Sequence, residues 1–487
     1  MATSNTKDDN KIFDENALAQ TTSYNDGEVL TEEIDEAYLR ASKTTKFYRG
    51  VLFQMIMFGT LSFVGPAMND AISNLGGGGL STPYLGNLAT SLNYISGCLV
   101  TLFGGPLINK IGIKWSCVIS GVAMPLLGSG WYVSAKYGVD WYLLLAKVIT
   151  GFSLGFLYVA ESTAMLSYPK ANDRGFYLGI WSAMRNSGSV MGGAINFSNN
   201  HSKANAGGIA LSTYLIFVAF ECTSPFWALL LTTTRRVRRP DGTKIPMSEK
   251  ASWKHEFNAL WKHMQRPKTW LMFVPAFYSF FYGGSMGTYL NLHFSVRARA
   301  LSSMIMPCLT IVMVLAYGKL LDTAHWSQKK RAWIAFAFWA IPQAACFIWI
   351  GIEYSKFGGG ATDALDYKLH TKRWVEAYLP YLIMFSTGYW CQLSIYWILG
   401  TFSTDVGSSS RTGGLFRAFE TAGQAVSYAI NSKTGSDARI PFYVNAGLLV
   451  LTIPSMVFLI RLVPEAPAST DIDVEPITHG VQDSDNK

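Results

Sequence analysis

Four ionisable side chains lie within long apolar stretches of the sequence, where an unpaired charge is costly. Lys147 and Glu161 share one stretch, and Arg185 and Glu221 lie near the middle of the next two. Such a residue in a membrane span is a candidate for binding a proton, an ion or a solute unless a neighbour neutralises it. Arg185 and Glu221 fall at similar depth, so one prediction is that they form a buried ion pair, and the alternative is that Arg185 takes part in the substrate path or in ion coupling. For Glu161, ion coupling and simple anchoring of its helix end both remain open.

The second half of the chain offers aromatic and amide side chains in place of charges. One group is Tyr389, Trp390 and Gln392. Rings and amides of this kind stack on an organic solute or hydrogen-bond to it. The alternative is a belt of aromatics at the membrane surface, but Trp390 lies too deep in its stretch for that. Similar polar or aromatic positions are Tyr278, Tyr282, Tyr289, Asn291, Tyr396, Trp397, Glu420 and Gln424.

The sequence shows no pattern typical of a catalytic centre or a metal site. Its six cysteines lie in apolar stretches without paired spacing, and its seven histidines lack metal-ligand spacing. No nucleophile and base stand in a recognisable motif. The run Gly76–Gly79 lacks the Lys-Ser/Thr ending of a phosphate-binding loop. We therefore expect neither an enzyme nor a cofactor.

The elements that position these residues are expected to cross a membrane. With 49% hydrophobic and only 15% charged residues, a chain of 487 residues is too apolar for a soluble protein. Half of the acidic residues lie in two polar tails, which leaves 34 Lys or Arg against 16 acids between them. No nucleic-acid-reading motif accompanies this basic balance. It is typical of membrane proteins, so the predicted partner is a lipid bilayer and not a nucleic acid.

Apolar stretches of the length needed to span a bilayer, ~20 residues, recur twelve times. The first six lie near Val51–Asp70, Tyr84–Leu107, Ser116–Ala135, Trp141–Met165, Phe176–Ile195 and Ala210–Thr232. The second six lie near Trp270–Leu292, Leu301–Leu321, Ala332–Ile352, Ala377–Gly400, Gly413–Ile430 and Phe442–Leu462. We therefore expect five parts: a polar tail (1–46), a six-helix bundle (47–234), a basic linker (235–268), a second six-helix bundle (269–463) and an acidic tail (464–487).

The distribution of basic residues predicts the orientation in the membrane. The linker carries ten basic residues against three acids, and cytoplasmic tails place it in the cytoplasm too. We expect a multi-pass protein of the plasma membrane or an endomembrane with both termini cytoplasmic. The sequons at Asn196 and Asn200 then fall outside, where they are either glycosylation sites or chance matches.

Two loops at corresponding places in the two halves resemble each other. GPLINKIGIK (Gly105–Lys114) follows the second span, and GKLLDTAHWSQKKR (Gly318–Arg331) follows the eighth. Each has a glycine, a leucine two residues later, a polar or acidic residue and then a basic cluster. Two matching halves predict two helical bundles around a central path, an architecture that moves solutes by rocking.

The first loop resembles the cytoplasmic signature of the major facilitator superfamily. Lys110 matches its basic position, while Asn109 stands where an aspartate is expected. The signature's role is a latch in which a carboxylate meets a helix N-terminus in the other half. In the second loop Asp322 keeps the carboxylate. We expect it near Arg411 or, alternatively, near the helix start at Gly175, and we expect Asn109 to accept a hydrogen bond near Thr412.

Four further motifs resemble the fungal branch of the Unc-ninety-three-like family of major-facilitator-type proteins. They are MNDAISNLGGGG (68–79), AESTAMLSYPKANDRG (160–175), RRPDGT (238–243) and YWILG (396–400). The resemblance implies an all-α membrane fold of twelve helices in two six-helix bundles. It also implies that the first and fourth helices of each half line the path, so that Lys147 and Glu161 face it.

The function implied by this resemblance is either transport or regulation. We expect a secondary transporter of a small organic solute that works by alternating access, with proton or ion coupling. The alternative is a non-transporting regulatory protein that acts as the partner of a channel or receptor, because the family includes such members.

Overall fold

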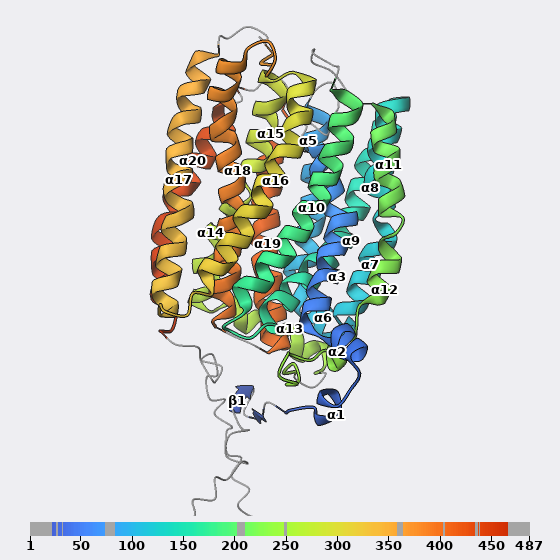
Figure 1. Ribbon diagram of the computed structural model, residues 1–487, viewed down its shortest axis with the longest axis vertical. Coiled ribbons are helices and arrows are strands. Elements are labelled where there is room, and N and C mark those ends of the chain that lie inside the picture. The colour runs from blue at the N-terminus through green and yellow to red at the C-terminus, as the bar shows by residue number, and fades with distance from the viewer. Residues whose placement is uncertain are drawn as a thin grey trace, which may run out of the picture.

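The computed structural model describes residues 22–25, 28–31, 33–73, 83–201, 210–247, 251–357, 364–402, 405–433, 437 and 439–465. Its helices stand side by side in one upright bundle (Figure 1). This arrangement confirms the predicted all-α membrane fold. The run Gly76–Gly79 and most of both tails lie outside the described residues.

The first half of the bundle holds the six predicted spans, several of them broken into two helices. A proline stands in the first turn after three of these breaks, at Pro66, Pro125 and Pro225. Its ring removes a backbone donor and favours the first turn of a new helix. The helices are α3 (Val51–Val64), α4 (Pro66–Ser73), α5 (Pro83–Leu102), α6 (Gly104–Ile111), α7 (Ile113–Ala123), α8 (Pro125–Tyr137), α9 (Asp140–Ser167), α10 (Arg174–Asn200), α11 (Leu211–Glu221) and α12 (Ser224–Leu230).

The second half holds the other six spans, and side-chain caps mark the starts of several helices. Ser295, Ser327 and Asp405 each accept a hydrogen bond from a backbone N–H in the first turn that follows. The helices are α14 (Pro267–Ser279), α15 (Tyr282–His293), α16 (Val296–Leu321), α17 (Gln328–Lys356), α18 (Thr371–Gly400), α19 (Val406–Ile430) and α20 (Arg439–Arg461).

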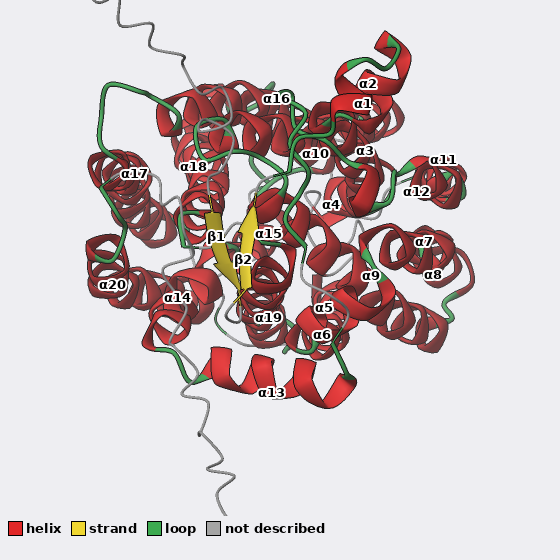
Figure 2. Cartoon of the chain, turned by 90° about the horizontal axis from the view of Figure 1, so that it is seen from below, coloured by secondary structure: helices red, strands yellow, loops and turns green. Residues whose placement is uncertain are grey.

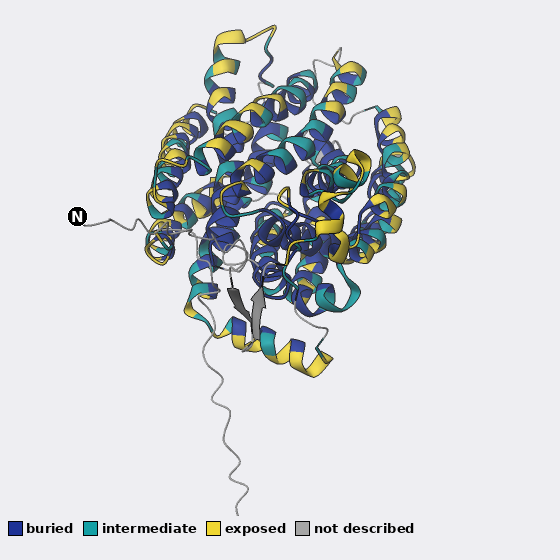
Figure 3. Cartoon of the chain, turned by 60° about the horizontal axis from the view of Figure 1, so that its bottom comes forward, coloured by how far each residue is buried: buried dark blue, intermediate teal, exposed yellow. Residues whose placement is uncertain are grey.

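Seven segments in the described ranges are long and apolar enough to cross a membrane, or eight if α5 and α6, bent by 67° at their junction, count as one. Helices α10, α18 and α19 run the same length but bury many polar side chains. Figure 3 shows that the buried residues line the inside of the bundle and the exposed ones its outside. The buried set includes many polar side chains of these three helices, whereas large apolar side chains are among the exposed residues. The outer surface is therefore suited to lipid.

Shorter elements gather at one end of the bundle, which we call the terminal end because the first helices and the last described residues lie there (Figure 1). The hairpin β1 (Thr22–Asn25) and β2 (Glu28–Thr31) is antiparallel. It is followed by α1 (Glu36–Leu39) and α2 (Lys43–Arg49). The linker, which we predicted only as a basic connection, contains the 3₁₀ turn η3 (Thr234–Arg236) and the helix α13 (Trp253–Met264).

The two halves meet mainly along α10 with α16 and along α5, α6 and α9 with α19. Viewed along the bundle axis, the first half lies on one side of these pairs and the second half on the other (Figure 2). Close approach depends on glycine at the terminal end: a Cβ on Gly318 would lie 2.5 Å from the carbonyl oxygen of Gly175. The halves are therefore packed backbone to backbone where α10 begins and α16 ends.

Candidate functional site

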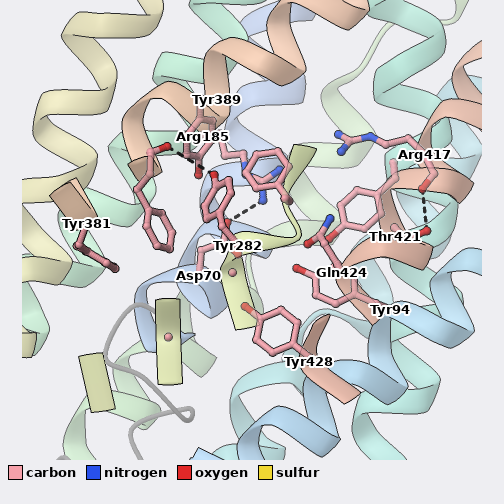
Figure 4. Close-up of a pocket in the computed structure, with 15 residues that line it drawn as sticks. Asp70, Tyr94, Arg185, Tyr282, Tyr381, Tyr389, Arg417, Thr421, Gln424 and Tyr428 are labelled. Carbon is pink, nitrogen blue, oxygen red and sulfur yellow. Dashed lines mark hydrogen bonds and ion pairs between the residues drawn. The ribbon is translucent and has the colours of Figure 1, made fainter. Parts of the chain in front are cut away.

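A cavity of about 50 Å³ lies between the two halves near the middle of the bundle. At this size it has room for a few water molecules. Figure 4 shows its wall of tyrosine rings with two arginines and one aspartate among them. The lining side chains that can form hydrogen bonds are Asp70, Tyr94, Tyr158, Arg185, Tyr282, Tyr381, Tyr389, Arg417, Thr421, Gln424 and Tyr428.

Arg185 is paired with Asp70 and not with Glu221, so the predicted ion pair is wrong. Its Nη2 lies 2.7 Å from Asp70 Oδ2, and both side chains line the cavity. Glu221 instead accepts a hydrogen bond of 2.9 Å from the backbone N–H of Gly128. The physical reason is the packing: α10 lies against α3, α4 and α16, whereas α11 packs mainly against α8. Adjacent spans in the sequence need not turn their charged faces toward one another.

Arg417 forms the centre of a buried network in the second half. Its Nη1 donates to Glu420, which also accepts 2.7 Å from Gln392 Nε2 and 3.2 Å from Ser279 Oγ. The guanidinium group lies over the ring of Tyr158, 5.0 Å from its centroid. Aromatic faces of this kind stabilise a cation. The sequence drew attention to Glu420 and Gln392 but not to Arg417.

Glu161 joins this network from the first half. Its Oε2 lies 3.8 Å from Arg417 Nη2, and its Oε1 accepts a hydrogen bond of 2.5 Å from Ser62. The carboxyl group is fully buried. Glu161 therefore forms an ion pair between the two halves next to the cavity, and is more than an anchor for the end of α9.

Contacts between the halves continue on both sides of the cavity along the bundle axis. Toward the far end, which is opposite the terminal end, Asn87 donates to the carbonyl of Asn431 at 2.9 Å. Toward the terminal end, Ser410 donates to Asn109 at 2.8 Å. The span formed by α5 and α6 thus contacts α19, or the residue that directly follows it, on both sides of the cavity.

Lys147 lies in the first half and does not reach the cavity wall. Its Nζ donates to Asn69 Oδ1 at 2.5 Å and lies 4.5 Å from the centroid of the Trp131 ring. The side chain is 1% exposed. A hydrogen bond and a ring face satisfy this ammonium group, so its immediate partners join α9 to α4 and α8.

Trp390 also lies away from the cavity, whereas its neighbour Tyr389 lines it. The indole Nε1 of Trp390 donates to the carbonyl of Met313 at 3.0 Å, and its ring stacks on Tyr317 with centroids 4.9 Å apart. Consecutive residues of a helix point in different directions. Because Tyr389 faces the cavity, Trp390 faces α16, and the prediction that both line one wall was wrong for Trp390.

One contact at the terminal end joins Asp322 to the start of α10, and we call it the second latch. Its two carboxyl oxygens accept hydrogen bonds from the backbone N–H groups of Gly175, at 2.8 Å, and Phe176, at 2.6 Å. A helix N-terminus has unpaired N–H groups and favours a negative charge. The helix start was our alternative partner for Asp322. The preferred partner, Arg411, was wrong because it lies on the other side of the interface, against Gly105.

The first latch joins Asn109 to α19 and also involves the linker helix α13. Asn109 Oδ1 accepts from Ser410, two residues from the predicted position. Its Nδ2 donates to Glu256 Oε2 at 2.9 Å, and Arg411 Nη1 lies 3.5 Å from the same oxygen. Lys110 donates to the carbonyl of Ala251. The carboxylate that the loop lacks is therefore supplied by Glu256.

The two predicted glycosylation positions are buried inside the bundle. The side-chain nitrogen of Asn196 donates to the carbonyl of Ala71 at 3.0 Å, and that of Asn200 donates to the carbonyl of Asn196 at 2.9 Å. Both residues are 0% exposed and belong to α10. A glycan is attached to this nitrogen, so the prediction of a glycoprotein is not supported at either position.

Fold and site together define a class: a polytopic helical membrane protein with two bundles around a central polar cavity. The family model of the Major Facilitator Superfamily matches residues 50–428. The chain belongs to this superfamily.

Named relatives extend the likeness over most of the chain. The Notoamide biosynthesis cluster protein O' of Aspergillus versicolor is 32% identical over 394 residues, which is 79% of this chain and 83% of the relative. UNC93-like protein 1 of Arabidopsis thaliana is 24% identical over 423 residues, 85% of this chain and 90% of the relative. These similarities confirm the resemblance to Unc-ninety-three-like proteins. The E. coli fucose:proton symporter shares the fold, with a TM-score of 0.55 and 13% identity over 84% of this chain and 98% of its own.

Proposed function

We propose that this protein is a secondary transporter that moves a small organic solute by alternating access through the central cavity. The observation that carries the proposal is the position of the cavity between the halves, with charged side chains from each half beside it. Rocking of one bundle against the other would widen the cavity toward one end at a time. Tyr389 and the other tyrosines offer ring faces and hydroxyl groups to such a solute.

The number of charges beside the cavity supports coupling to protons. Three carboxyl groups, Asp70, Glu161 and Glu420, stand against two guanidinium groups, Arg185 and Arg417. An uncompensated negative charge is costly in a dry interior, and one bound proton removes it. Glu161 is our choice for that proton, because its protonation weakens the ion pair that ties the two halves together. The fold neighbour from E. coli is itself named as a fucose:proton symporter.

The remaining predicted residues take supporting roles in this proposal. Gln392 holds Glu420 in place. Lys147 fixes the first bundle from within, and Trp390 fixes α18 against α16. We further propose that residues 47–234 and 269–463 are the two moving bundles. We place the terminal end on the cytoplasmic side of the plasma membrane or an endomembrane, because the linker at this end is basic.

A flux measurement with the purified chain in lipid vesicles tests the function. Vesicles are placed in a metabolite extract under an imposed pH gradient, and mass spectrometry reads the solutes that accumulate inside. Accumulation that collapses with the gradient, and that is absent in vesicles without protein, is the expected result. If no solute moves under either polarity of the gradient, the protein is not a transporter and the regulatory alternative takes its place.

Glu161→Gln tests the coupling site within the same measurement. The amide cannot release or bind the proton, so gradient-driven accumulation should be lost while exchange of solute across the membrane partly persists. The pH dependence of exchange should flatten as well. A variant whose accumulation and pH dependence match the original protein would remove Glu161 from the coupling role without affecting the proposal of transport.

A further inference from the structure

The linker helix α13 exposes a row of three aromatic side chains, which we call the aromatic ridge. Trp253, Phe257 and Trp261 are 48%, 44% and 60% exposed. They are spaced four residues apart and therefore follow one side of the helix. A row of large rings in water is unfavourable, and exposed apolar patches of this kind mark surfaces that bind a membrane or another molecule.

The ridge lies level with the edge of the membrane-facing surface. The ring of Phe257 is 6.1 Å from that of Phe103. Phe103 directly follows α5 and continues its outward stripe of Leu88, Ile95 and Leu99, all of them exposed. At the other end of α13, Trp270 at the start of α14 donates its indole N–H to the carbonyl of Met264 at 2.9 Å. Lipid-facing residues of two spans thus flank the ridge.

The orientation of α13 fits a position on the membrane surface. In the view along the bundle axis, α13 lies across the line of sight at the rim of the molecule, whereas the spans point toward the viewer (Figure 2). Its axis is therefore roughly parallel to the plane of the membrane. An amphipathic helix in this position buries its apolar side among the lipid head groups and upper acyl chains.

The charges of α13 favour an anionic membrane surface. Lys254 and Lys262 are exposed beside the ridge. The helix has one acidic residue, Glu256, and its side chain is buried on the inward side. Basic side chains next to an apolar row attract phospholipids with negative head groups. A soluble protein partner would require an acidic surface that also reaches down to the lipid-facing edge, which makes the membrane the better match.

The inward side of α13 contacts the first latch, which together with the second latch forms what we call the gate at the terminal end. Glu256 accepts the hydrogen bond from Asn109 and lies beside Arg411, and His263 Nε2 is 3.1 Å from Thr412 Oγ1. Asn109 belongs to the first half, and Arg411 and Thr412 to the second. Any contact that holds α13 in place therefore also holds Glu256 on the first latch.

We propose that α13 is a membrane-surface helix whose aromatic ridge and flanking lysines bind anionic phospholipids of the leaflet at the terminal end. Lipid binding on its outward side keeps Glu256 seated on the first latch. The first latch is thereby sensitive to the lipid composition of that leaflet, whatever solute the protein carries.

Hydrogen exchange of the full chain in lipid nanodiscs tests the proposal. Amide exchange in α13 is compared in discs of phosphatidylcholine with and without phosphatidylserine. We expect slower exchange when phosphatidylserine is present. Lys254→Gln combined with Lys262→Gln should abolish the difference, because each lysine is expected to contribute a factor of up to about five to the slowing of exchange by phosphatidylserine. The matched control is Lys368→Gln with Lys372→Gln, two exposed lysines near the start of α18 at the far end, which should leave the difference intact.

The aromatic part is tested separately by Phe257→Ser, which should raise exchange of α13 in both kinds of disc. Equal exchange with and without phosphatidylserine in the original protein would overturn the proposal. So would protection of α13 that appears in native membranes but in neither kind of disc, because a protein partner would then cover the ridge.

Discussion

The two latches at the terminal end join the same two halves with different chemistry. In the second latch one carboxylate, Asp322, sits directly on two backbone N–H groups at the start of α10. In the first latch an amide, Asn109, bonds to α19, and the carboxylate comes from Glu256, 147 residues further along the chain. The carboxylate that the first loop lacks is thus supplied by a different element, the linker helix α13.

This difference changes what can control each latch. Asp322 directly follows α16 and moves with the second half. The second latch therefore opens only when that half moves relative to the first. Glu256 belongs to α13, which is connected to the spans through loops and lies at the rim of the molecule. The first latch therefore depends on the position of a separate helix. A comparison of loop sequences shows only that one acid is missing, whereas the fold shows where its replacement lies.

The largest effect is expected from Asp322→Asn. The amide keeps the shape but can accept only through its oxygen, so one of the two N–H groups loses its acceptor and the charge on the helix start is gone. Hydrogen bonds to a charged group are worth about 1.5–3 kcal/mol, so the ratio of open to closed terminal ends should rise about 10- to 100-fold. Spin labels introduced at Asn172→Cys and Ala324→Cys in a cysteine-free chain report this ratio as a distance distribution.

The matched control is Asp173→Asn at the start of the same helix. Asp173 is exposed and makes no side-chain capping bond, so the same change of charge removes no contact between the halves. Equal shifts from the two variants would mean that only the general field at the helix start matters, and that the two hydrogen bonds of Asp322 do not close the gate.

The sequence predicted the bundle well because its signal is local. Each apolar stretch of about twenty residues, and each of the two matching loops, can be recognised from one continuous segment of the chain. The partners of buried charges were harder to predict. Arg185 pairs with Asp70, 115 residues away, and Arg417 was overlooked since a lone arginine in a polar stretch of α19 gives no local signal. Helix α13 was also missed, although Trp253, Phe257 and Trp261 at four-residue spacing could have revealed an amphipathic helix.

A smaller effect is expected from Glu256→Gln. The amide oxygen still accepts from Asn109, but the attraction to Arg411 at 3.5 Å loses its charge. Both side chains are mostly buried, but the ion pair is long and the hydrogen bond from Asn109 is kept in a neutral form, so the open-to-closed ratio should rise about threefold. Glu36→Gln, which removes an exposed acid at the same end, serves as the control and should change nothing. A shift as large as that of Asp322→Asn would show that the first latch is at least as strong as the second.

The smallest net effect is expected from moving the carboxylate back to the loop. Asn109→Asp alone places a second negative charge next to Glu256, and repulsion between the two carboxylates should open the gate. In the Glu256→Gln background the same change restores one carboxylate and one amide, with their positions exchanged. Ser410 can still donate to the new side chain, and the start of α19 still favours a negative charge. The open-to-closed ratio of this double variant should therefore return to within about twofold of the original protein, a net coupling that a double-mutant cycle measures. Additive effects of the two substitutions would instead show that Asn109 and Glu256 act on the gate independently, and that the carboxylate of α13 does not take the place of the missing aspartate.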